Sequence, residues 1–136
     1  MEPLQQLRAK IAEFPGYDGD LERRRSDEYV RSYLGEALAA LVARSQLAPD
    51  VREKIDDLIL RVGFADPRSF AMHQFIATKP QAGEQDAVAD FDAATVTLAD
   101  RAASVDAASA AQYVDDVTAA LDRRDAAMRA ASSTTP

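Results

Sequence analysis

The chain has 136 residues, no cysteine and a formal net charge of −7. This length fits one domain with its own core, and the absence of thiols excludes disulfides and cysteine-based zinc sites. The acidity disfavours binding to nucleic-acid phosphates or anionic membranes, and no run approaches the roughly 20 apolar residues of a membrane span. Residues 1–10 contain no continuous apolar run, so we expect no secretory signal and a cytoplasmic location.

Residues 1–77 are predicted to form a compact helical unit that begins with an amphipathic helix. Pro15-Gly16 predicts the turn that ends this first helix. Its apolar residues recur at three- and four-residue spacing and so share one face: Leu4, Leu7, Ile11 and Phe14.

A second helix is predicted to run to about Ser45, with a broad apolar face that suits a core. Its start is less obvious. Ser26 is a good N-cap residue, with acidic residues following it in the first turn. A start at Asp20 is the alternative, but it would leave Leu21 off the apolar face. We therefore favour Ser26.

Two further helices are predicted before residue 78. Pro49 suits the first turn of a helix whose apolar stripe ends at Gly63, a typical helix-ending residue. A short helix over residues 67–77 follows, which is apolar around most of its circumference and carries His73, the only histidine.

Beyond a linker at residues 78–85, the chain becomes rich in alanine and in acidic residues. Residues 1–80 contain 12 Lys/Arg and 13 Asp/Glu, whereas residues 81–136 contain 4 and 10. Two narrow apolar stripes predict an antiparallel helical hairpin over residues 84–131, and residues 132–136 are expected to be disordered. The two stripes are Val88, Phe91, Thr95, Leu98, Ala102 and Val105, and then Ala110, Val114, Val117, Leu121, Arg124 and Met128.

The overall prediction is an all-α bundle of about six helices with this C-terminal hairpin. The hairpin has too little apolar surface to stand alone, so it must pack on residues 1–77 or on a second copy. We favour a homodimer, with packing within one chain as the alternative. The expected interface residues are Phe91, Leu98, Val114, Val117 and Leu121.

No catalytic or metal-binding constellation stands out in the sequence. His73 lacks a recognisable nucleophile or metal-ligand partner. Glu53, Asp56 and Asp57 share one side of a helix, but no second carboxylate pair is available to complete a Mg²⁺ site. We therefore predict no catalytic residue, no metal and no cofactor.

Three consecutive arginines, Arg23 to Arg25, are the least ordinary feature of the sequence. They oppose the positive end of the helix dipole expected after them, which neighbouring acids or a binding partner must offset. The candidate binding residues are these arginines, two nearby tyrosines and the histidine: Arg23, Arg24, Arg25, Tyr29, Tyr33 and His73.

The sequence thus favours a non-catalytic protein–protein interaction module that self-associates. A stoichiometric inhibitor or immunity-like regulator of a basic partner is one alternative, because an acidic face can cover a basic active site. A small-ligand-binding or metal-dependent helical enzyme is the other.

Overall fold

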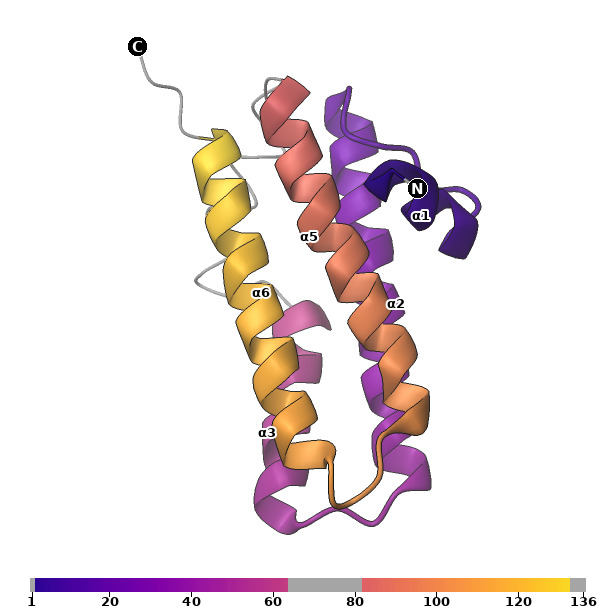
Figure 1. Cartoon of the computed structure of the whole chain (residues 1–136), viewed down its shortest axis with the longest axis vertical. Helices are drawn as coiled ribbons and strands as arrows, with labels where there is room; N and C mark the ends of the chain where they lie inside the picture. Colours follow the sequence, from indigo (N-terminus) through magenta and orange to yellow (C-terminus); the bar gives the residue numbers. More distant parts are fainter. Residues whose placement is uncertain (1, 64–81, 133–136) are drawn as a thin grey trace.

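The computed structural model describes residues 2–63 and 82–132, and all the regular structure in these two ranges is helical (Figure 1). The predicted all-α class is therefore confirmed. The helix expected over residues 67–77 lies outside the described residues. None of the described helices is both long and apolar enough to cross a membrane. The elements are α1 (Pro3–Lys10), α2 (Asp20–Arg44), α3 (Pro49–Gly63), α5 (Ala82–Arg101), a 3₁₀ turn η2 (Ala102–Ser104) and α6 (Ala110–Ser132).

Helix α1 is shorter than its apolar stripe predicts. It ends at Lys10, although Ile11 and Phe14 are buried as expected. The side chain of Arg8 folds back over the following loop, where Nε donates to the carbonyl of Phe14 at 3.1 Å. The loop then turns at Gly16, whose φ of 98° lies in the left-handed region that glycine tolerates. Ile11 and Phe14 are therefore buried by the loop that follows α1 and not by a longer helix.

The predicted start of α2 at Ser26 is wrong, because the helix begins at Asp20. Ser26 lies inside the helix with its hydroxyl buried. That hydroxyl donates to the carbonyl of Gly16 at 2.6 Å and accepts from its amide at 3.1 Å. It thus ties down the preceding loop and does not cap the helix. Because the helix starts at Asp20, Leu21 lies off its apolar face and is 55 % exposed, as we expected for a start at Asp20.

Four long helices, α2, α3, α5 and α6, lie side by side, and the short α1 packs across α5 (Figure 1). Contacts between α5 and α6 run in opposite directions along the two helices. Arg124 bonds Asp92, whereas the earlier Tyr113 donates to the carbonyl of the later Leu98. The core has one part between α2, α3 and α6 and a second part beneath α1.

The apolar stripe predicted in α6 is buried at all six positions, whereas the stripe predicted from Val88 to Val105 is buried at four of its six positions. Phe91 and Leu98 are only partly buried, and their neighbours Asp92 and Ala99 are fully buried instead. At the level of Phe91 the helix buries Asp92 instead, a carboxylate that pairs with Arg124 inside the bundle.

Candidate functional site

The centre of the bundle contains an ion network between three helices. Arg124 of α6 is 3 % exposed and lies between two buried carboxylates, Asp92 of α5 and Asp27 of α2. Its Nε donates to Asp92, and its Nη2 donates to Asp27 Oδ1 at 2.6 Å. Removing charges from water costs several kcal/mol per ion, so such groups persist only when each has close partners.

Two further side chains complete this buried ion network. The hydroxyl of Tyr17, from the loop before α2, donates to Asp92 Oδ2 at 2.5 Å. Arg31 of α2 donates from Nε to Asp27 Oδ2 at 2.8 Å. Two carboxylates are thereby balanced by two guanidinium groups. No fully buried side-chain nitrogen or oxygen of these five residues lacks a hydrogen bond.

The network shifts the pKa values of its members in the directions that burial and charge dictate. Burial raises the pKa of Asp92, although Arg124 and Tyr17 oppose the shift by stabilising the carboxylate. Burial also raises the pKa of Tyr17 well above its ordinary value, and the charge of Asp92 adds to this. Burial alone would lower the pKa of Arg124, but the two carboxylates outweigh it and raise that pKa. Arg124 is therefore a fixed cation.

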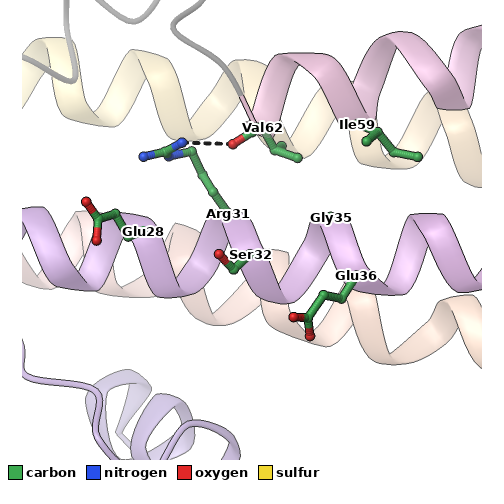
Figure 2. Close-up of a pocket in the computed structure, with 8 residues that line it drawn as sticks. Glu28, Arg31, Ser32, Gly35, Glu36, Ile59 and Val62 are labelled. Atoms are coloured by element: carbon green, nitrogen blue, oxygen red, sulfur yellow. Dashed lines mark hydrogen bonds between the residues drawn. The ribbon is translucent and has the colours of Figure 1, made fainter.

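Arg31 connects the buried ion network to the protein surface. Its Nη1 donates to the carbonyl of Val62 in α3 at 2.8 Å, across a groove between α2 and α3 (Figure 2). A Cβ at Gly35 would lie 3.4 Å from Val62, an ordinary contact, so the two helices are close neighbours at this level. The groove encloses about 280 Å³ and combines apolar side chains of α3 with two glutamates of α2. It is lined by Glu28, Arg31, Ser32, Gly35, Glu36, Ile59, Val62 and Gly63.

A second, more apolar cavity of about 250 Å³ lies between α1 and α5, with Lys10 among its lining residues. Lys10 pairs with Asp100 at 3.1 Å, and the hydroxyl of Tyr33 donates to the same carboxylate at 2.5 Å. Burial alone would raise the pKa of Asp100, but these two donors hold it below its ordinary value. The hydrogen bond raises the pKa of Tyr33 to about 12.

The structure divides the predicted arginine triplet. Arg23 is buried, donates to the carbonyls of Tyr17 and Asp18 at 3.1 Å each, and pairs with Asp20. It therefore holds the loop before α2. Arg24 and Arg25 are exposed.

The other predicted binding residues do not meet at one site. Tyr29 and Tyr33 are partly buried and pack beside the core beneath α1. The hydroxyl of Tyr33 bonds Asp100, away from the α2–α3 groove. His73 lies outside the described residues.

Three of the five residues expected at a dimer interface belong to the core of the chain itself. Val114, Val117 and Leu121 are buried in one cluster with apolar residues of α2 and α3. Phe91 and Leu98 are partly exposed. A contact between the 84–131 segments of two copies stays a prediction, and in this fold it would rest on those two residues.

The comparisons add no relative to this description. Searches against protein families, curated proteins and solved structures return no match. Within the described residues, no group of three or more histidine or acidic side chains is arranged to hold a metal ion.

The sequence predicted the position of one member of the ion network but not its role. Arg124 falls in the predicted α6 stripe, and a charge inside an apolar stripe is a signal for a buried counter-charge. No local pattern in the sequence marks Asp27 and Asp92 as the partners of Arg124.

Proposed function

We propose that this protein is a non-catalytic helical interaction module that acts as a homodimer. The supporting observation is a division of its charges between interior and surface. The two buried carboxylates, Asp27 and Asp92, both bond the buried Arg124. These charged groups are thereby used in ion pairs within the fold and are not presented to a substrate. The proposal includes the bundle of about six helices whose residues 84–131 form an antiparallel hairpin.

The exposed charges of α2 have the opposite character. Arg25, Glu28 and Glu36 are exposed and form no hydrogen bond or ion pair with the residues that the structure describes. Charges of both signs on one helix face suit a contact with another protein surface, because they steer encounter and fix register. The groove beside them, at about 280 Å³, lies at the lower end of the range of small-ligand pockets, roughly 300–1,000 Å³.

Native mass spectrometry on the purified full chain tests this proposal. We expect a concentration-dependent dimer mass without an adduct. A monomer at every concentration would overturn the homodimer. A stoichiometric adduct of metal or small molecule would contradict the interaction module and favour a ligand-binding protein.

A further inference from the structure

The outer face of α2 carries a charge pattern that is complementary to itself. Its exposed residues follow three- and four-residue spacing, so they form one stripe along the helix. Arg25 lies toward the N-terminal end of the stripe, the acidic residues Glu28 and Glu36 follow it, and small side chains occupy the other positions beyond Leu21. The stripe consists of Leu21, Arg25, Glu28, Ser32, Glu36, Ala39 and Ala43.

We propose that this stripe binds the same stripe of a second copy in an antiparallel arrangement, with Arg25 of each copy beside Glu36 of the other. The inference rests on the proposed homodimeric function and assigns its interface to α2, in place of the contact predicted between the 84–131 segments. A twofold axis brings the same patch of both copies together and makes every pair of contacts occur twice. In this dimer the twofold axis would pass midway between positions 25 and 36, that is between Val30 and Arg31.

This register gives both exposed leucines a partner. Leu21 and Leu60, 55 % and 54 % exposed, are the exposed large apolar residues of the described chain. With Arg25 opposite Glu36, Leu21 lies level with Ala40 of the second copy. Single exposed leucines are ordinary on protein surfaces. Here one register places both exposed leucines near the same interface, so one arrangement accounts for both.

Leu60 reaches the same place from α3. The short connection between α2 and α3 makes these helices antiparallel neighbours, and Gly35 lies beside Val62. Counting back along α3 from Val62 brings Leu60 within about one helical turn of the level of Ala40. The register thus brings Leu21 of one copy close to the level of the exposed Leu60 of the other.

The size of the surface sets the expected strength of the dimer. A helix of 25 residues is about 37 Å long and about 10 Å wide, which offers roughly 400 Å² of contact. Standard interfaces bury about 800 Å² per partner, so α2 alone is too small and the neighbouring face of α3 must contribute. We expect a dimer of moderate affinity that dissociates on dilution.

Charge reversal of Arg25 and Glu36 tests the register. Arg25→Glu places acid against acid, and Glu36→Arg places base against base, so each variant alone should dimerise about tenfold more weakly or worse. An equimolar mixture of the two variants should form a heterodimer, because each copy then offers the charge that the other lacks. The chain that carries both substitutions should regain the affinity of the native protein.

Sedimentation velocity and native mass spectrometry over a concentration series provide the measurement. Arg123→Glu, an exposed reversal on α6, is the matched control and should leave dimerisation unchanged. A native chain that stays monomeric overturns the proposed function. A native dimer that neither Arg25→Glu nor Glu36→Arg weakens overturns this interface and leaves the function standing. Weakening in both variants without recovery in the mixture overturns the pairing.

Discussion

Replacement of Arg124 by methionine should destabilise the fold strongly, because it leaves two buried carboxylates without their shared cation. Asp92 and Asp27 are 0 % and 2 % exposed, so neither can recover water. Removing one partner of a buried ion pair costs about 3–5 kcal/mol. Domains of this size have a total stability of about 5–15 kcal/mol, so the variant should fold but lose a large share of it.

Urea unfolding followed by circular dichroism measures this loss. With a slope of about 2 kcal/mol per molar urea, the transition midpoint should fall by about 2 M. Arg123→Met is the matched control, since Arg123 is exposed and adjacent in sequence; its effect should stay within about 0.5 kcal/mol.

The loss should also depend on pH, and its direction is fixed by Asp92. Burial already raises the pKa of Asp92, and removal of Arg124 raises it further. A group with a raised folded-state pKa favours folding when it is protonated. The deficit of Arg124→Met should therefore be largest at neutral pH and shrink as the pH falls towards 3.8, the ordinary value for aspartate.

A second substitution separates the charge effect from lost packing. Asp92→Asn in the Arg124→Met background removes one unpaired carboxylate, so it should restore about 1 kcal/mol or more. A deficit below about 1 kcal/mol in Arg124→Met, or one equal at pH 4 and pH 7, would refute the reasoning. A further loss of stability when Asp92→Asn is added to Arg124→Met, equal to the loss that Asp92→Asn causes alone, would also refute it.

Three smaller substitutions test other contacts. Tyr17→Phe removes the donor to the buried Oδ2 of Asp92 and should cost about 1–3 kcal/mol in urea unfolding at neutral pH, with a smaller deficit in acid. Tyr33→Phe should raise the carboxyl pKa of Asp100 in an NMR titration, because a donor that holds this pKa down is lost; an unchanged pKa would contradict the hydrogen bond. Gly35→Ala should raise the melting temperature by about 2–8 °C, because alanine favours the helix interior and its Cβ meets an ordinary contact at 3.4 Å; a lower melting temperature would show that the helices cannot accept a methyl group there.

Helix positions were predictable where they depend on a periodic apolar pattern. The bounds of α3 at Pro49 and Gly63 agree with the turn chemistry, and the α6 stripe is buried throughout. The start of α2 was mistaken because Ser26 has two possible uses for its hydroxyl. It can cap a helix or bond a loop, and a tertiary contact with Gly16 decided between them.

The ion network could not be predicted from spacing, because its members are paired only by the fold. Asp92 lies 32 residues from Arg124, and no local pattern relates them. A charged residue is placed on the surface by default, so the apolar face of α5 was centred on Phe91 and not on Asp92. Arg124 offered the usable clue, since its place in an apolar stripe demands an acid nearby.

The separation between Asp27 and Arg124 also bears on how the chain folds during synthesis. The two residues are 97 positions apart, and Arg124 lies near the end of the last helix. A ribosome-bound chain that lacks α6 cannot bury Asp92 without leaving its charge unpaired, and Asp27 then keeps only Arg31 as an ionic partner. We therefore expect the N-terminal helices to stay loosely packed until nearly the whole chain has emerged, so that folding is completed in one late cooperative step.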